Sequence, residues 1–183
     1  MMFLKPTTKL FINGQFVESK TKQWTNVYDP ATNEVLTRVP EATTDEMEDA
    51  VAAAKEAYKT WKNTSILTRQ QCMFRFRNLI KENLTELARN ITKEQGKTLM
   101  DAESDVIAGL RAVEHCCSIP SLSLGETLGG IAKDMDTITY RMPLGVTAGI
   151  TPFNMPAMIP LAVDFICDHP DIKAISFVGS NLV

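Results

Sequence analysis

The stretch "LGVTAGITPFNMPAM" (144–158) decides the fold class. Its first half, 144–151, is apolar and β-branched on both faces, which is typical of a strand buried in a parallel sheet. A second strand of this kind is predicted in "DIKAISFVGSN" (171–181), and 156–170 can form one helix, although Pro160 would disturb its first turns. Strand, crossover and strand make a βαβ unit of about the minimum length. We therefore predict an α/β chain with a partial, Rossmann-like parallel sheet.

The carboxyl ends of these two strands are the candidate binding site, because ligands of open parallel sheets bind there. The first strand ends in Thr151-Pro152-Phe153-Asn154 and the second in Gly179-Ser180. Gly179 would let the backbone approach a ligand, and a helix starting after it would offer free N–H groups to a phosphate. The pattern indicates half of a nucleotide-binding crevice. The chain contains no GxGxxG or GxxxxGK motif, so a structural turn at each strand end is the competing interpretation.

Asn154 also has two interpretations. An Asn beside prolines is usually a turn former, because its side chain bonds to the nearby backbone. Alternatively, its amide could donate to a developing oxyanion, a role worth a few kcal/mol where water is excluded. Spacing alone does not choose between them.

The residues before this stretch predict two hairpins and a helical block. Asn13-Gly14 marks the turn of a hairpin in "KLFINGQFVES" (9–19), and residues 29–33 mark the turn of another over 27–40. Thr43 and Glu46 form a capping box that starts a helix. Apolar spacing predicts further helices over about 66–82, 84–95 and 98–117. Residues 118–130 are predicted to be a loop and 136–143 a short strand. The Met and Phe side chains of 70–80 are predicted to lie in the core.

Composition excludes several classes of protein. The 183 residues fit one domain, or one compact domain plus extensions. They are 44% hydrophobic and 22% charged with a net charge of −3, so we expect a soluble globular protein, no nucleic-acid partner and no anionic-membrane partner. No apolar stretch approaches the roughly 18 residues of a membrane span. "MMFLKPTTKL" (1–10) is too short and polar for a signal or transit peptide, which predicts a cytoplasmic chain or a form lacking its targeting segment. The four cysteines have no zinc-ligand spacing with His115 or His169, so we predict reduced thiols and no metal site.

Several motifs resemble the aldehyde dehydrogenase superfamily, and within it the CoA-acylating methylmalonate-semialdehyde dehydrogenase branch. They are "KLFINGQFVES", "DPATNEV", "RQQCMFRFRNLIKENLTELARNITKEQGKTLMDAESDV", "KDMDTITYRMPLGVTAGITPFNMPAMIPL" and "VDFICDHPDIKAISFVGSN". Together they cover nearly the whole chain. The resemblance implies an incomplete aldehyde dehydrogenase fold and a mitochondrial matrix location.

The resemblance also implies a chemistry for the strand ends. Asn154 matches the superfamily's amide donor to the thiohemiacetal oxyanion, Thr151 and Phe153 match positions lining the NAD site, and Gly179 and Ser180 match the turn near the cofactor's pyrophosphate. In the family, a cysteine thiolate attacks the semialdehyde, hydride passes to NAD, and the acyl group passes to CoA. The products from methylmalonate or malonate semialdehyde are propionyl-CoA or acetyl-CoA and carbon dioxide, in valine and pyrimidine catabolism.

The same resemblance predicts missing parts. After "AMIPL" (157–161) the family continues its helix and adds a further strand bearing a lysine for the adenosine ribose, whereas "AVDFICDHP" follows here. None of the cysteines (Cys72, Cys116, Cys117 and Cys167) has the family's nucleophile context. We therefore expect a truncated, internally deleted form that lacks the catalytic domain and is inactive by itself. The alternatives are an interaction fragment that co-assembles with full-length subunits, as a homo- or hetero-oligomer, and an unstable product.

The predicted organisation has four parts. Residues 1–42 are a hairpin arm, and 43–135 are the helical part of an NAD-binding domain. Residues 136–143 are a remnant of the family's oligomerisation ribbon, and 144–183 are a partial βαβ unit.

Overall fold

Two antiparallel hairpins begin the chain, as predicted. The structure is a computed structural model that describes residues 6–150, 154 and 172–177. Strand β1 (Leu10–Ile12) pairs with β2 (Gln15–Val17), and β3 (Trp24–Tyr28) pairs with β4 (Val35–Pro40). Asn13 and Gly14 have φ values of 51° and 75°, the left-handed conformation that a two-residue hairpin turn requires. The local turn chemistry therefore determines the first hairpin.

Helix α1 (Thr44–Trp61) begins at the predicted capping box and is tied to the first hairpin. The Thr43 hydroxyl accepts from the Glu46 backbone N–H, and the Glu46 carboxylate accepts from the Thr43 N–H at 2.9 Å. The same carboxylate accepts from the Lys20 N–H at 2.7 Å and from the Ser19 hydroxyl at 2.9 Å. Glu46 thus caps its own helix and also holds the segment after β2 against that helix.

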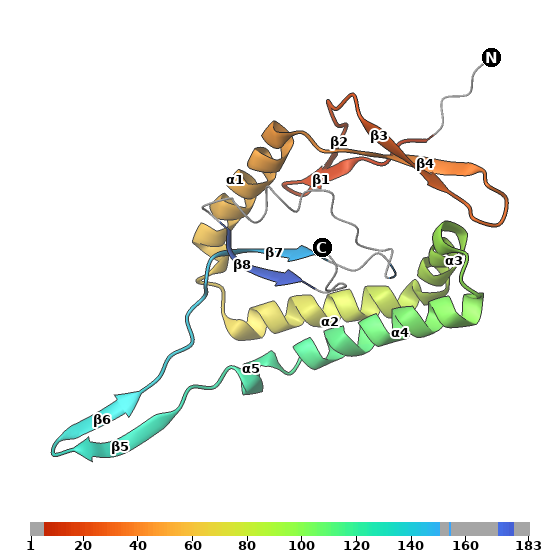
Figure 1. The fold of residues 1–183 in the computed structure, drawn as a ribbon. Coiled ribbons are helices and arrows are strands. Elements are labelled where there is room, and N and C mark those ends of the chain that lie inside the picture. Colours follow the sequence, from red (N-terminus) through yellow and green to blue (C-terminus); the bar gives the residue numbers. More distant parts are fainter. Residues whose placement is uncertain (1–5, 151–153, 155–171, 178–183) are drawn as a thin grey trace.

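The predicted helical block is present with nearly the predicted bounds. Helix α2 (Ile66–Glu82) runs alongside α4 (Leu99–Cys116), and α3 (Leu84–Gln95) packs against α4 (Figure 1). Ala88 on α3 and Ala102 on α4 are both 0% exposed, since small side chains let the helices approach closely. Arg77 on α2 contacts the Glu114 carboxylate on α4 through Nε at 2.9 Å and Nη2 at 2.7 Å. These contacts join the three helices into one layer.

The segment predicted as a loop over 118–130 contains regular structure instead. Helix α5 (Ile119–Leu122) follows α4, and β5 (Thr127–Ala132) pairs antiparallel with β6 (Met135–Ile138). The predicted strand over 136–143 is therefore shorter and shifted. We call the β5–β6 pair the ribbon. Glycines in 125–130 are weak strand formers, but β5 is stabilised by its pairing with β6 and by the hydrogen bond from the Glu126 N–H to the Thr139 hydroxyl at 2.7 Å. Pairing across the ribbon overrides the local propensity.

The parallel strand pair is present as predicted. Strand β7 (Val146–Ile150) pairs parallel with β8 (Ile172–Phe177), with Gly149 opposite Ser176 and Ile150 opposite Phe177. The prediction that the first strand is buried on both faces is wrong, because Thr147 and Gly149 are exposed. In the described residues each strand has a single hydrogen-bonded neighbour, and helix α1 packs against β7. The helix predicted over 156–170 lies outside the described residues.

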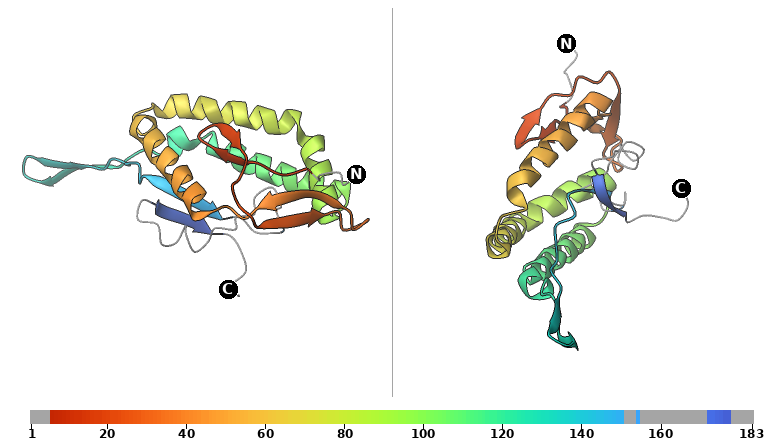
Figure 2. Two further views of the ribbon diagram at one scale, coloured as in Figure 1. Left: turned by 90° about the horizontal axis from the view of Figure 1, so that it is seen from above. Right: turned by 90° about the vertical axis from the view of Figure 1, so that its left-hand side faces the viewer.

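Much of the apolar surface has no cover. Phe74 and Phe76 on α2 are 41% and 49% exposed, so the prediction of a core role is wrong for these two side chains, and Leu79 on the same helix is 56% exposed. The chain exposes 13842 Å², whereas a compact 20.3 kDa monomer exposes roughly 8,800 Å². Figures 1 and 2 show one contribution: the β5–β6 ribbon projects away from the helices. An apolar helical face is buried only where another element packs against it.

No helix in the described ranges is both long and apolar enough to cross a lipid bilayer.

Candidate functional site

Asn154, the predicted oxyanion donor, is held by two side chains from the α3–α4 connection. Its backbone carbonyl accepts a hydrogen bond from Gln95 Nε2 and another from Lys97 Nζ, each at 3.1 Å. The Lys97 ammonium also forms an ion pair with the Asp105 carboxylate on α4. Asn154 itself is exposed. The helical layer therefore determines where the backbone lies just after β7.

Gly96, between these two donors, makes the arrangement possible. It ends α3 with φ of +79°, and its N–H donates to the Thr92 carbonyl at 2.8 Å. This left-handed conformation is strained for residues other than glycine. A Cβ atom at Gly96 would also lie 2.8 Å from Cγ of Pro30, in the turn between β3 and β4. The sharp turn lets Gln95 and Lys97 both reach Asn154 while the second hairpin packs against it.

The start of β7 is held in a similar way. The hydroxyl of Tyr58 on α1 donates to the carbonyl of Pro143 at 3.3 Å, and α1 packs against β7. Side chains of the helical block thus bond to main-chain carbonyls on both sides of the strand. The carboxyl end of β7 is consequently fixed relative to the helices.

The structure pairs the two strands whose carboxyl ends the sequence predicts to form the site. The carboxyl ends of β7 and β8 lie side by side, because the strands are parallel and Ile150 pairs with Phe177. Asn154 follows β7 in the sequence. Thr151, Phe153, Gly179 and Ser180 lie outside the described residues, so their predicted cofactor contacts remain predictions. Sequence reasoning missed Gln95 and Lys97, although the polar residues around a helix-ending glycine were the available signal.

The described cysteines have contacts within the helical block. Arg75 Nη2 donates to Cys72 Sγ at 3.0 Å on α2, and the buried Cys117 thiol donates to the Val113 carbonyl at 3.4 Å. Cys72, Cys116 and Cys117 are free thiols. Among the described residues, no group of three or more His, Cys, Asp or Glu side chains could hold a metal ion. Cys167 lies outside the described residues.

Two carboxylates, Glu46 at the start of α1 and Glu94 near the end of α3, have shifted pKa values. Burial raises the pKa of Glu46, but hydrogen bonds from the backbone of Thr43 and Lys20 and from the Ser19 and Thr43 hydroxyls outweigh it, so the pKa is lowered from 4.5. Partial burial raises the pKa of Glu94, which precedes Gln95 on α3. Neither group contacts Asn154 in the described structure, and we assign neither a catalytic role.

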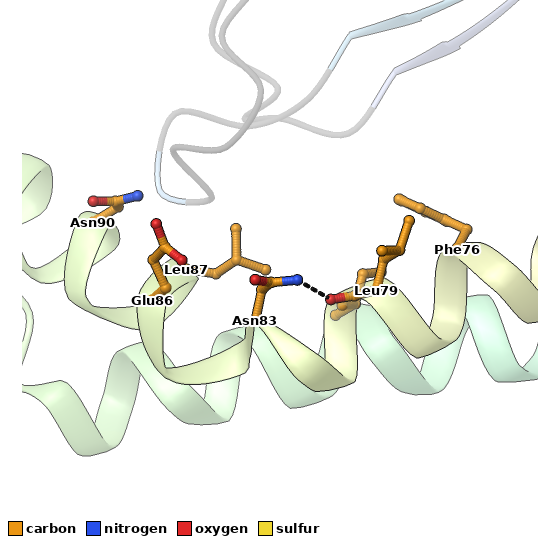
Figure 3. A pocket seen from close by; sticks show the side chains of 7 residues that line it. Phe76, Leu79, Asn83, Glu86, Leu87 and Asn90 are labelled. Atoms are coloured by element: carbon orange, nitrogen blue, oxygen red, sulfur yellow. Dashed lines mark hydrogen bonds between the residues drawn. The ribbon is translucent and has the colours of Figure 1, made fainter.

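A groove of about 340 Å³ lies along α2 and α3 (Figure 3). The Asn83 side chain in this groove is already engaged, because its Nδ2 donates to the Leu79 carbonyl at 2.8 Å. Glu86 is the only ionisable side chain of the lining. The groove is therefore an apolar packing surface with a polar margin. It is lined by Phe76, Leu79, Ile80, Asn83, Glu86, Leu87 and Asn90.

Known proteins resemble this chain in sequence. The model of the aldehyde dehydrogenase family matches residues 16–165. The mitochondrial methylmalonate-semialdehyde/malonate-semialdehyde dehydrogenases [acylating] of Rattus norvegicus and Homo sapiens are 52% and 50% identical over 226 residues, which cover 96% of this chain and 42% of each relative. The chain thus spans less than half of their length. Because the 226 aligned residues exceed the chain's 183, the relatives contain an internal segment with no counterpart here, as predicted.

Solved structures resemble the chain in fold. A protein from Sinorhizobium meliloti described as a methylmalonate-semialdehyde dehydrogenase, complexed with NAD, matches with a TM-score of 0.91 and 30% identity over 98% of this chain and 47% of its own. The methylmalonate-semialdehyde dehydrogenase of Oceanimonas doudoroffii matches with a TM-score of 0.79 and 39% identity over 86% of this chain and 32% of its own. The predicted fold, a fragment of the aldehyde dehydrogenase architecture, is confirmed. The chain belongs to the aldehyde dehydrogenase family.

Proposed function

We propose that these residues are the NAD-binding side of a CoA-acylating methylmalonate-semialdehyde dehydrogenase, and that the 183 residues do not catalyse the reaction by themselves. The observation that carries the proposal is the parallel β7–β8 pair with adjacent carboxyl ends, together with the anchored Asn154 that follows β7 in the chain. The relatives' names and the NAD in the Sinorhizobium meliloti structure support it.

The described residues fit part of a cofactor crevice. Two parallel strands end at one edge, where ligands of such sheets bind. Thr151 and Phe153 would line the nicotinamide cofactor, and Gly179 with Ser180 would let its pyrophosphate approach the backbone. When bound, NAD supplies the acceptor for hydride. The chain's own contribution would be to bind and orient the cofactor and to place an amide donor at the reacting carbonyl.

Asn154 would act on the oxyanion formed when a thiolate adds to the semialdehyde. Its side-chain N–H would stabilise the negative charge on that oxygen, a contribution of roughly 3–4 kcal/mol for one donor in a site closed to water. The reaction also needs an activated nucleophile. Cys72, Cys116 and Cys117 are committed to the helical block, so we assign none of them this role.

The test is a calorimetric titration of the purified chain with NAD, together with a melting curve and an assay of NADH formation. The assay contains methylmalonate semialdehyde and CoA. We expect heat of binding, a cooperative melt and no NADH. Formation of NADH would overturn the inactivity, and a cooperatively folded chain that releases no heat with NAD would overturn the cofactor role. A chain that neither binds nor melts cooperatively would be the unstable product predicted as an alternative.

A second candidate function is co-assembly with full-length subunits. It is favoured by the β5–β6 ribbon, which is exposed along its whole length and projects from the helical layer (Figure 2). Its apolar side chains have no cover in the described structure. Chromatography of this chain mixed with a full-length relative tests the idea, since a mixed oligomer supports it and separate elution contradicts it. We propose the mitochondrial matrix as the compartment, because the relatives are named mitochondrial.

A further inference from the structure

We propose that Gln95 and Lys97 are positioning residues that orient Asn154 for its role as an amide donor. The inference rests on the proposed function and extends it to residues that would not touch the substrate themselves. It starts from two hydrogen bonds that converge on one atom. Gln95 Nε2 and Lys97 Nζ both lie 3.1 Å from the carbonyl oxygen of Asn154, across 59 and 57 residues of sequence.

Two donors on one carbonyl restrain the peptide plane in two directions. A carbonyl oxygen has two acceptor positions, and here both donors come from a single rigid turn around Gly96. The Lys97 donor is charged, which makes its bond stronger than one between neutral groups. Restraining the peptide plane after Asn154 restrains ψ of that residue, and hence the direction in which its side chain leaves the backbone.

Gln95 is held in one orientation at an energetic cost. Its Oε1 is buried and accepts no hydrogen bond from the described residues, which costs about 1–3 kcal/mol. Turning the amide over would place Oε1 against the Asn154 carbonyl, bringing two acceptors together. The observed orientation is therefore the one that donates to Asn154. Buried polar atoms without partners are rare in folded proteins, and each calls for an explanation of this kind.

The Lys97 ammonium is also held by a residue of α4. The Asp105 carboxylate on α4 pairs with its ammonium, and the two side chains are 26% and 29% exposed. Lysine chains are long and flexible, so an isolated one would lose considerable rotamer entropy by donating to a carbonyl. Asp105 lowers that loss by fixing the ammonium beforehand. Asp105, Lys97 and Asn154 thus connect α4 to the end of β7.

The sequence allows a selective measurement of this contact. Asn154-Met155 is the only Asn-Met pair in the chain. A protein labelled with ¹³C at Asn carbonyls and ¹⁵N at Met amides therefore gives one carbonyl-to-amide NMR correlation, which reports on the Asn154 carbonyl. A second sample with ¹⁵N-labelled Asn side chains reports on its amide, assigned by its loss in Asn154→Ala. Both are recorded without NAD, so a failure of cofactor binding is separate from a failure here.

Three variants and one control test the proposal. Gln95→Met and Lys97→Met remove one donor each, Lys97→Arg keeps a charged donor, and Lys93→Met removes an exposed lysine from the last turn of α3. We expect the carbonyl carbon to move upfield and the Asn154 side-chain signals to move towards random-coil positions in the two Met variants. In Lys97→Arg the NMR signals should stay close to their wild-type positions, and in Lys93→Met they should not change.

The outcomes that would overturn the proposal are distinct. If the chemical shift of the Asn154 carbonyl carbon does not change in the Met variants, the two hydrogen bonds do not form in solution. If that shift changes while the side-chain amide signals keep their positions, Gln95 and Lys97 anchor the backbone without orienting the donor. If one Met variant fails to melt cooperatively, the other and Lys97→Arg still decide the result.

Discussion

The hydroxyl of Tyr58 on α1 donates a hydrogen bond to the carbonyl of Pro143, 85 residues further along the chain. This contact and the Gln95 and Lys97 contacts with Asn154 lie on either side of β7. The strand that leads to the candidate site is therefore attached to the helices at both ends. Its placement depends on polar side chains, because its faces are not covered by a continuous core.

Removing the Tyr58 hydroxyl tests the first of these attachments. We expect Tyr58→Phe to lower the free energy of unfolding by about 0.5–1.5 kcal/mol, since one hydrogen bond is lost and the ring is kept. Urea unfolding followed by circular dichroism measures the change. Tyr140→Phe, at a side chain 78% exposed beyond the ribbon, is the control and should change nothing measurable. An equal loss in both variants would contradict a specific role for the contact.

The lowered pKa of Glu46 predicts that the free energy of unfolding depends on pH. Its pKa is lowered from 4.5 in the folded chain, so its ionised form stabilises the fold at higher pH. That contribution is fully present above pH 4.5 and is lost as the pH falls through the lower, folded pKa. Glu46→Gln should therefore lose stability at pH 7 and show a shallower decline between about pH 5 and 3.

Urea midpoints across this range measure the Glu46 effect. Glu82→Gln, at an exposed carboxylate at the end of α2, is the matched control and should follow the wild type. If Glu46→Gln declines with pH as steeply as the wild type, the carboxylate is not the group responsible.

Because α3 and α4 pack closely, a larger side chain at the buried Ala102 should destabilise the fold. Ala102 is 0% exposed, so Ala102→Leu forces extra methyl groups between the helices and should cost about 1–3 kcal/mol. Ala108→Leu, on an exposed position of the same helix, keeps the chemistry of the change and should be nearly neutral. Thermal melts compare the two. Similar melting temperatures would show that the helices do not pack closely at Ala102.

If the β5–β6 ribbon is the interface with full-length subunits, polar substitutions on it should weaken co-assembly. Leu128 and Ile138 are 59% and 53% exposed on β5 and β6, so burying the remaining surface in an assembly would stabilise it by about 1–2 kcal/mol each. Leu128→Gln and Ile138→Gln should each raise the dissociation constant for a full-length relative by roughly tenfold or more. Leu67→Gln, at an exposed leucine on α2, is the control. Analytical ultracentrifugation gives the constants, and unchanged constants would exclude the ribbon as the interface.

Local chemistry in the sequence determined much of this protein. The hairpin turn at Asn13-Gly14, the capping box of Thr43 and Glu46, and the end of α3 at Gly96 all involve residues within a few positions of one another. Such hydrogen bonds form wherever the right residues occur at the right spacing, so the sequence predicts them. The apolar, β-branched runs likewise predicted a parallel strand pair, and the motifs predicted the family.

Only the tertiary structure decided which faces are covered and what holds Asn154. Phe76 has the spacing of a core residue and remains 49% exposed, because burial depends on what packs against a helix. The β5 strand exists despite its glycines, because β6 pairs with it. Gln95 and Lys97 reach Asn154 across more than fifty residues, a proximity that no local pattern encodes. Contacts of this range follow from how helices and strands pack, and the sequence alone does not reveal them.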